Sequence, residues 1–403
     1  MANRREFLVG AAAAALGART VILAEPVAKT RFAYVGTYTS RPDGTGNGEG
    51  IYLFDVDAET GELRNRRVAA KSVNATWLAL HPSKKFLYAS NEVSDYVGPD
   101  GKLGGSVSAF AIDAATGALT ALNVVASEGA GPGHISVDAS GRFAFVANYG
   151  GGTFAVLPIL DNGHLGPALQ VIRQTGAHGA QLATEAPHGS FAISGHDRPH
   201  PHQILATPDN RFVLAVDLGE DRIYTYRLDA ATGKLTLADQ DAVTSLPSGN
   251  GPRHVLFHPN QHWLYLVEEE ASRVAFYHYN QATGKLALQQ SLSALPEGFA
   301  GTNYCSEIVL SADARFLYCA GRLHDHIAIF AVEADGKLTY QGEVSAMGDY
   351  PRHIALAPDG NYLYACTQRS DAITTFHVDR ATGALRFTGR YTAAGAPAVL
   401  TFL

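Results

Sequence analysis

Short apolar segments alternate with polar turns along nearly the whole chain, and one of the turns recurs with the same residues. It is a glycine turn followed by leucine, as in TGEL at 60–63 and TGAL at 116–119. Further copies lie at 162–165, 232–235, 283–286, 335–338 and 382–385. Glycine at such a turn supplies the positive φ angle that a tight connection between strands requires. The seven copies, about 50 residues apart, indicate seven structural units.

A second pattern interleaves with the first. It is a polar hairpin followed by an aromatic-rich apolar segment, as in HPSKKFLYASN at 81–91, and its other copies begin at 138, 207, 258, 311 and 357. A short apolar run such as WLAL or HVLF precedes each copy. A continuous apolar run, rather than an alternating one, predicts a strand that is covered on both faces.

A period of about 50 residues built from short strands is typical of a β-propeller, in which four-stranded blades surround a central channel. The segment FAYVGTY at 32–38 matches the second strand of a blade, and APAVLTFL at 396–403 matches a first strand. We therefore predict an all-β, seven-bladed β-propeller over residues 31–403. The C-terminal strand should join the N-terminal blade and close the ring.

Aligning the repeats predicts a polar rim at one mouth of the channel. Each innermost strand should begin there, and the antiparallel strand that follows should end there. The charged and imidazole residues at these positions are His134, His202, His254, His353, Arg253, Arg322, Arg352, Glu269 and Glu307. Titratable groups gathered in a concave mouth are typical of a functional site. The alternative is that strand-initial positions are polar only because they meet solvent, which accounts poorly for four histidines and three arginines.

Charge and composition narrow the choice of partner. The net charge is −7 at pH 7, and no run of Lys or Arg follows the N-terminus. This argues against nucleic acid or an anionic membrane as the main partner. The three cysteines, Cys305, Cys319 and Cys366, fit neither a disulfide framework nor a zinc pattern, so we expect buried thiols. We expect a monomer that acts on a small molecule.

The N-terminus differs from the rest of the chain. Arg4 and Arg5 precede Phe7, Leu8 and a run of about a dozen small, mildly apolar residues, which is too short for a stable membrane-spanning helix. Residues 1–24 are therefore predicted to be a removable twin-arginine export signal, which would deliver the protein to the periplasm without a membrane anchor. The alternative is an N-terminal extension on a cytoplasmic protein.

The longest repeat contains an insert at 178–203 that is rich in histidine. We interpret it as a lid over the channel mouth, with one or two imidazoles reaching the site. Imidazole suits zinc or nickel, but the insert has no compact ligand spacing. We therefore predict no metal and no cofactor for the site, with a catalytic metal as the alternative.

Four segments carry distinctive residue combinations: RPHPHQILATPDNRFVLAVDLGEDRIYTYRLD at 198–229, GNGPRHVLFHP at 249–259, SEIVLSADARFLY at 306–318 and YPRHIALAPDG at 350–360. They resemble the propeller-type lactonases, a family that includes 6-phosphogluconolactonases and a lactonising cyclase acting on muconate. The resemblance covers about residues 31–403. The chain departs from the family pattern at Glu268, where asparagine is usual, and at Ala320-Gly321, where a polar pair often precedes the arginine. An export signal also fits poorly with 6-phosphogluconolactone, which arises in the cytoplasm.

The resemblance implies hydrolysis of a sugar lactone, of the 6-phosphogluconolactone or gluconolactone type. No Gly-x-Ser-x-Gly motif supports a serine nucleophile, so we predict metal-independent attack by water. Glu269 or His202 would be the general base, His254 or His353 would transfer protons, and the arginines would hold an oxyanion or a phosphate. Catalysis is thus assigned to Glu269, His202, His254 and Arg322. Substrate binding is assigned to His134, Arg253, Glu307, Arg352 and His353.

Two other functions remain open from the sequence. One is a cyclase or isomerase acting on a carboxylated lactone, for which the arginines would serve equally well. The other is a propeller without catalytic activity that binds a sugar or a protein partner.

Overall fold

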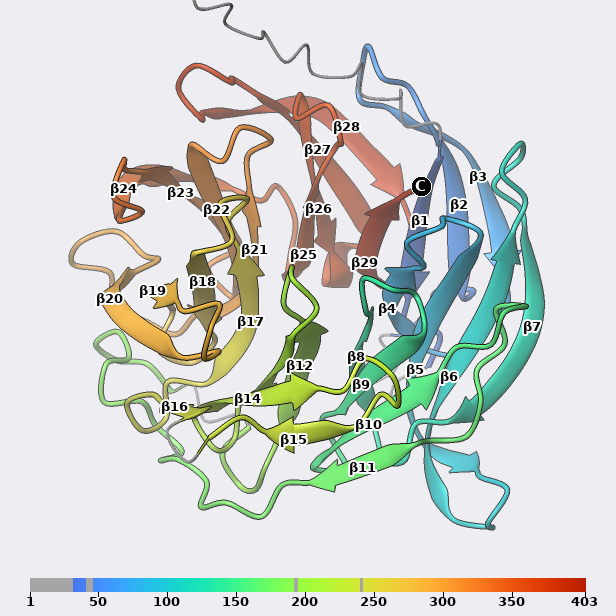
Figure 1. Cartoon of the computed structure of the whole chain (residues 1–403). Helices are drawn as coiled ribbons and strands as arrows, with labels where there is room; N and C mark the ends of the chain where they lie inside the picture. The colour runs from blue at the N-terminus through green and yellow to red at the C-terminus, as the bar shows by residue number, and fades with distance from the viewer. Residues whose placement is uncertain (1–31, 41–45, 192–194, 240–241) are drawn as a thin grey trace, which may run out of the picture.

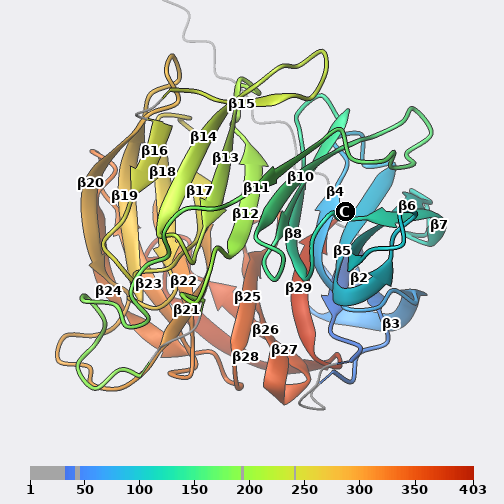
Figure 2. The ribbon, with the colours of Figure 1, turned by 90° about the horizontal axis from the view of Figure 1, so that it is seen from below.

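The computed structural model describes residues 32–40, 46–191, 195–239 and 242–403. Seven antiparallel sheets surround a central axis, and in each sheet the strands follow one another from the axis outward (Figure 1). Seen from below, the strands run between the two faces of the ring (Figure 2). The predicted all-β, seven-bladed propeller is confirmed.

Each blade contains four strands that follow one another from the innermost position to the outermost. The innermost strands are β29 (Pro397–Phe402), β4 (Ala75–Leu80), β8 (Pro132–Val137), β12 (Pro201–Ala206), β17 (Pro252–Phe257), β21 (Tyr304–Leu310) and β25 (Pro351–Leu356). The second strands are β1 (Phe32–Thr37), β5 (Phe86–Val97), β9 (Phe143–Asn148), β13 (Phe212–Asp217), β18 (Trp263–Glu268), β22 (Phe316–Arg322) and β26 (Tyr362–Thr367).

The outer half of each blade follows the same order. The third strands are β2 (Ile51–Val56), β6 (Leu103–Ile112), β10 (Thr153–Pro158), β14 (Arg222–Leu228), β19 (Arg273–Tyr279), β23 (His326–Val332) and β27 (Ala372–Val378). The outermost strands are β3 (Leu63–Ala70), β7 (Leu119–Ala126), β11 (Gln170–Arg173), β15 (Leu235–Leu237), β20 (Leu286–Ser293), β24 (Leu338–Ser345) and β28 (Leu385–Ala393). A further short strand, β16 (Val243–Ser245), also pairs with β14, and η2 (Gln368–Ser370) is a single 3-10 turn.

The ring closes as the sequence predicted. β29 pairs antiparallel with β1, so the C-terminal strand forms the innermost position of the first blade. The second strands are mainly apolar, with polar residues toward their ends, because neighbouring blades cover both of their faces; every residue of β1 and β13 is buried. The outermost strands are largely exposed and polar, as in β3.

The two sequence repeats meet at the junctions between blades. In five of the seven blades a tyrosine of the second strand donates a hydrogen bond to the carbonyl of the turn glycine in the next blade, as from Tyr265 to Gly336 at 2.8 Å. The same bond, from Tyr364 to Gly61 at 2.8 Å, joins the last blade to the first. All seven turn glycines have φ angles between 68° and 89°. A Cβ at Gly61 would also lie 2.4 Å from the ring of Tyr362, so glycine is required for conformation and for space.

The proposed export signal at 1–24 lies outside the described residues. In the part of the chain that is described, no helix has the length and apolar character to cross a bilayer.

Candidate active site

Two consecutive side chains of an innermost strand reach the channel because the strand carries a bulge near its start. In β17 the pairing with β18 shifts between Pro252 and His254, which makes Arg253 the extra residue. The same shift occurs in β25 between Pro351 and His353. A bulge redirects a side chain that regular alternation would send to the opposite face. This explains why an arginine and a histidine follow one another at the start of an apolar strand.

The third residues of four innermost strands lie together in the channel with Glu307, the fourth residue of β21. The ring centroid of Trp77 lies 4.8 Å from that of His134, 4.9 Å from His254 and 5.4 Å from His353. Oε2 of Glu307 lies 3.0 Å from Nδ1 of His254 and 3.7 Å from Nε2 of His353. Burial lowers the pKa of His134 and His254 well below 6.5 and that of His353 to about 4. These imidazoles are therefore neutral at pH 7.

A cavity of about 230 Å³ lies at the mouth of the channel. Its lining comes from the loops that follow the second strands and from the first residues of the innermost strands. The lining residues are Tyr38, Glu92, Gly133, Tyr149, His202, Glu269, Tyr304, Arg322, Tyr350 and Arg352. The cavity is thus polar, with two carboxylates, two guanidinium groups, one imidazole and four phenols in its walls.

Glu269 is held between two arginines. Its Oε2 lies 2.6 Å from Nη2 of Arg322 and 3.0 Å from Nε of Arg253, and the side chains of both arginines are almost fully buried. Burial by itself would raise the pKa of Glu269, but Arg322 and Arg253 outweigh it and lower the pKa below its ordinary value. The carboxylate therefore stays ionised and serves to fix the two guanidinium groups.

Tyr350 meets Arg322 on the other side. Nη1 of Arg322 donates to the Tyr350 hydroxyl at 3.3 Å, and its guanidinium carbon lies 5.2 Å from the ring centroid. The nearby Arg322 lowers the pKa of Tyr350 below its ordinary value. The backbone of Tyr350 has a φ angle of 62°, which is uncommon for an aromatic residue and places its ring in the cavity wall.

Arg352 forms a second arginine–carboxylate pair. Its Nη2 lies 3.5 Å from Oε2 of Glu92, and its guanidinium carbon lies 5.2 Å from the ring of Tyr38. The Tyr38 and Thr76 hydroxyls each donate to Oε2 of Glu92 at 2.8 Å. Both arginines in the cavity wall therefore already have a carboxylate partner.

His202 is the imidazole in the cavity wall. Its ring centroid lies 4.9 Å from that of His254 and 5.6 Å from that of Tyr149. Its Nδ1 makes no hydrogen bond within the described part of the chain. Burial, followed by the charge of Arg253, lowers the pKa of His202 well below 6.5. The ring is therefore neutral at pH 7, so one of its two nitrogens carries a lone pair.

The histidine-rich insert contacts the cavity indirectly. His200 stacks on Tyr149 with ring centroids 4.3 Å apart and bonds Asp197 through Nε2 at 2.7 Å. His178 and His188 are exposed. Of the described insert residues, only His202 lines the cavity, and it does so from β12. The described part of the predicted lid therefore supports the cavity wall from behind Tyr149, and its one residue in the wall is His202.

The nine candidate residues divide into two layers. Four of them line the cavity: His202, Glu269, Arg322 and Arg352. Arg253 lies behind Glu269, while His134, His254, Glu307 and His353 form the buried layer with Trp77. The sequence-based list omitted Glu92 and the four phenols. Tyr38, Glu92 and Tyr149 occupy the same position after a second strand as Glu269, so the repeat alignment was the signal that could have included them.

Comparison with known proteins adds to this picture of a seven-bladed propeller with a charged cavity at one mouth. The model of the family described as "Lactonase, 7-bladed beta-propeller" matches residues 32–402. The 6-phosphogluconolactonase of Bacillus subtilis is 35% identical over 353 residues, which is 87% of this chain and 92% of the relative. The 6-phosphogluconolactonase of Pectobacterium carotovorum is 34% identical over 321 residues, covering 79% of this chain and 85% of the relative.

Among solved structures, the periplasmic gluconolactonase of Pseudomonas aeruginosa has a TM-score of 0.80 and 30% identity. The match covers 93% of this chain and 99% of that one. The chain belongs to the lactonase family of seven-bladed β-propellers.

Proposed function

We propose that the protein hydrolyses a sugar δ-lactone to the open-chain acid in the cavity at the channel mouth. The observation that carries the proposal is the placement of a neutral imidazole, His202, in the same small cavity as the guanidinium groups of Arg322 and Arg352. Ester hydrolysis by water needs a base and a cationic or hydrogen-bond-donating site for the oxyanion, and these residues supply both. The relatives named as 6-phosphogluconolactonases and gluconolactonase support the same reaction class.

In the proposed mechanism, His202 accepts a proton from a water molecule as the water attacks the lactone carbonyl. Arg322 stabilises the oxyanion of the tetrahedral intermediate, held in place by Glu269. The intermediate collapses with cleavage of the bond to the ring oxygen, and Tyr350 donates a proton to that leaving alkoxide. His202 then releases its proton to water in the cavity, directly or by way of the neighbouring His254, and Tyr350 takes up a proton from water, so that both groups return to their starting states. Glu269 is assigned to positioning rather than to proton abstraction because two arginines share its Oε2.

The reaction as proposed uses no metal ion. Within the described chain, the group of three potential ligands with atoms close enough to share an ion is His324, His326 and Glu343. None of the three lines the cavity.

The charge balance of the cavity favours an unphosphorylated lactone of the gluconolactone type. Arg322 is paired with Glu269 and Arg352 with Glu92, so a phosphate dianion would have to compete with two carboxylates. A cavity of about 230 Å³ accommodates one sugar ring.

We further propose that the protein is exported to the periplasm through the signal at residues 1–24 and acts there as a monomer. Cell fractionation of the full chain and of an Arg4→Lys, Arg5→Lys variant tests the route. The variant should remain in the cytoplasm, and periplasmic accumulation of both would contradict twin-arginine export. Size-exclusion chromatography with light scattering tests the monomer.

The function is tested by assaying the purified protein on glucono-δ-lactone, 6-phosphoglucono-δ-lactone and a muconolactone, each against its spontaneous rate. The proposal predicts acceleration of the first two, with a higher kcat/KM for glucono-δ-lactone. Turnover of the muconolactone alone would indicate a cyclase or isomerase. Spontaneous rates with all three would favour a binding protein without catalytic activity.

A further inference from the structure

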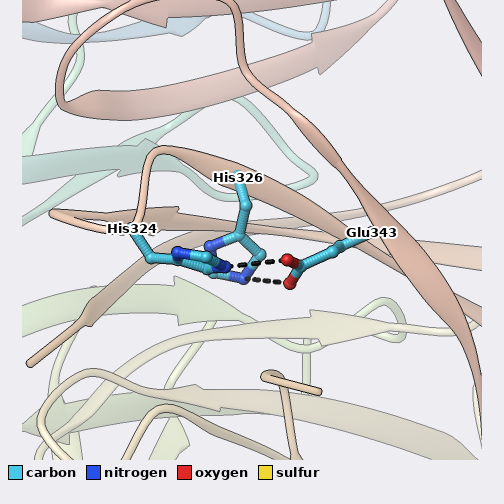
Figure 3. A group of neighbouring side chains, drawn as sticks. All are labelled: His324, His326 and Glu343. Carbon is cyan, nitrogen blue, oxygen red and sulfur yellow. Dashed lines mark hydrogen bonds and ion pairs between the residues drawn. The ribbon is translucent and has the colours of Figure 1, made fainter. Parts of the chain in front are cut away.

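A second group of titratable side chains lies on the sixth blade, outside the cavity. His324 is in the hairpin between β22 and β23, His326 is the first residue of β23, and Glu343 lies on β24 (Figure 3). One ligand atom from each of the three lies within 4.8 Å of the others. Among the described residues, this is the group of His, Cys, Asp or Glu side chains whose ligand atoms lie close enough together to share a metal ion.

The carboxylate of Glu343 faces both imidazoles. Its Oε1 lies 2.7 Å from Nε2 of His324, and its Oε2 lies 3.9 Å from Nε2 of His326. These two distances bracket the separation of about 3.4 Å between neighbouring ligands around a tetrahedral zinc ion with bonds of about 2.1 Å. Tyr340 also donates to Oε2, at 3.4 Å.

We propose that Nε2 of His324, Nε2 of His326 and the carboxylate of Glu343 bind a divalent transition metal ion of the zinc type. Two imidazoles and one carboxylate form a ligand set suited to such an ion, and a water molecule would complete the tetrahedron. The side chain of His326 is 2% exposed, whereas those of His324 and Glu343 are 30% and 24% exposed. The site is therefore anchored on a buried residue and open to solvent on one side.

The surroundings of His326 supply a second, independent argument. Its Nδ1 and the Oδ1 atom of Asn303 are both buried, and neither makes a hydrogen bond with a described residue. Both atoms face Gly321, where a Cβ would lie 2.6 Å from Nδ1 and 2.7 Å from Oδ1. When Nε2 carries the ring proton it donates to the Ala294 carbonyl at 3.1 Å, and Nδ1 is then a buried acceptor with no donor among the described residues.

Metal binding at Nε2 would move the ring proton of His326 from the side of the Ala294 carbonyl to Nδ1. With the ion at Nε2, the ring proton of His326 resides on Nδ1, on the side of the ring where Asn303 Oδ1 also faces Gly321 and lacks a donor. An outer acceptor that fixes the tautomer in this way is the usual companion of a ligating histidine.

The position of the site suggests a structural role. His324 follows Arg322 by two residues, and its ring packs on Phe299 with centroids 4.8 Å apart. An ion bound by β23, β24 and the hairpin of His324 would hold this hairpin in place directly after Arg322, which lines the cavity. It would thus stabilise the sixth blade without entering the reaction.

The test is a titration of the full chain, produced without a polyhistidine tag and freed of metal with a chelator, with Co²⁺ and Zn²⁺. The site should bind one Co²⁺ per chain with the visible absorption of a tetrahedral complex, and Zn²⁺ should displace it. His324→Gln and Glu343→Gln should each weaken binding by about 100-fold or more, the upper range for disturbing a zinc site. The control His278→Gln, at an exposed imidazole on β19, should bind as the wild type does.

Both substituted ligands are partly exposed, so these variants should fold, and far-ultraviolet circular dichroism checks that they do. An Asn303→Ala variant should weaken binding by about 10-fold if the outer hydrogen bond is made. Absence of saturable Co²⁺ binding by the wild type, or unchanged binding by His324→Gln, would overturn the proposal. Lactone hydrolysis is not part of the readout, so the two proposals fail separately.

Discussion

Nη2 of Arg322 lies 2.6 Å from Oε2 of Glu269, and the same oxygen lies 3.0 Å from Nε of Arg253. A carboxylate shared between two buried guanidinium groups is better suited to holding them than to removing a proton from water. The assignment of Glu269 as a positioning residue and His202 as the base rests on this relationship.

Glu269→Gln should therefore damage both activity and stability. Loss of the carboxylate leaves two buried cations without their partner, which costs about 3–5 kcal/mol of unfolding free energy. We expect kcat/KM to fall roughly 100-fold because the oxyanion site is no longer held in place. Steady-state kinetics and urea unfolding measure the two effects, with Glu59→Gln at an exposed position as the control. Wild-type turnover in Glu269→Gln would exclude any role for this residue in the reaction.

The pH dependence of the Glu269→Gln variant, compared with that of the wild type, separates the two candidate bases. Burial and the charge of Arg253 lower the pKa of His202 well below 6.5, so the ring remains neutral as the pH falls through 6.5. Activity should stay level there and decline only at more acidic pH, when the ring takes up a proton. Glu269→Gln should keep this acidic limb in its residual kcat/KM. Disappearance of the limb in that variant would show that Glu269 is the base.

Tyr350→Phe tests the proton donor. The substitution removes the hydroxyl that lies 3.3 Å from Nη1 of Arg322 and keeps the ring in the cavity wall. We expect kcat to fall by about 10- to 100-fold with a smaller change in KM, since the lost group acts on the leaving alkoxide. Tyr391→Phe, on the exposed side of β28, is the matched control. A fall in affinity with unchanged kcat would instead assign Tyr350 to substrate binding.

Replacing Glu268, next to Glu269, should raise the unfolding free energy, whereas replacing Glu269 should lower it. Burial raises its pKa to about 7, although the Asn250 amide donates to it at 2.6 Å. A raised carboxyl pKa means that the folded state holds the proton more tightly, so this group lowers stability as the pH rises from 4.5 through 7. Glu268→Gln should raise the unfolding free energy by roughly 2 kcal/mol at about pH 8 and change it little at about pH 4.5. Urea midpoints of the wild type and the variant at the two pH values check this. A midpoint of Glu268→Gln below that of the wild type at the higher pH would refute it.

The fold was predictable because the repeats fix it at several levels. The turn glycines and the tyrosines that bond them mark the repeated blades. The first and last strands of the chain lack a neighbour in sequence and pair with each other, which closes the ring. The positions of the rim residues followed from the same alignment.

The division of the rim into two layers could not be predicted. It depends on the bulges that turn Arg253 and His254 toward the channel together, and the proline that begins such a bulge is equally common at the start of a regular strand. Tyr350 was missed because its place in the wall depends on a backbone with positive φ. The group around Glu343 could not be predicted because its residues come from the β22–β23 hairpin, β23 and β24, which the repeated motifs do not include.

The most direct test of the central claim is the kcat/KM for glucono-δ-lactone of the wild type and of His202→Gln, measured near pH 6.5 where spontaneous hydrolysis is slow. The exposed His262→Gln variant is the control. The account predicts catalysis by the wild type and the control, and a loss of about 100-fold or more in His202→Gln with an unchanged fold. Equal kcat/KM values for the wild type and His202→Gln would contradict it.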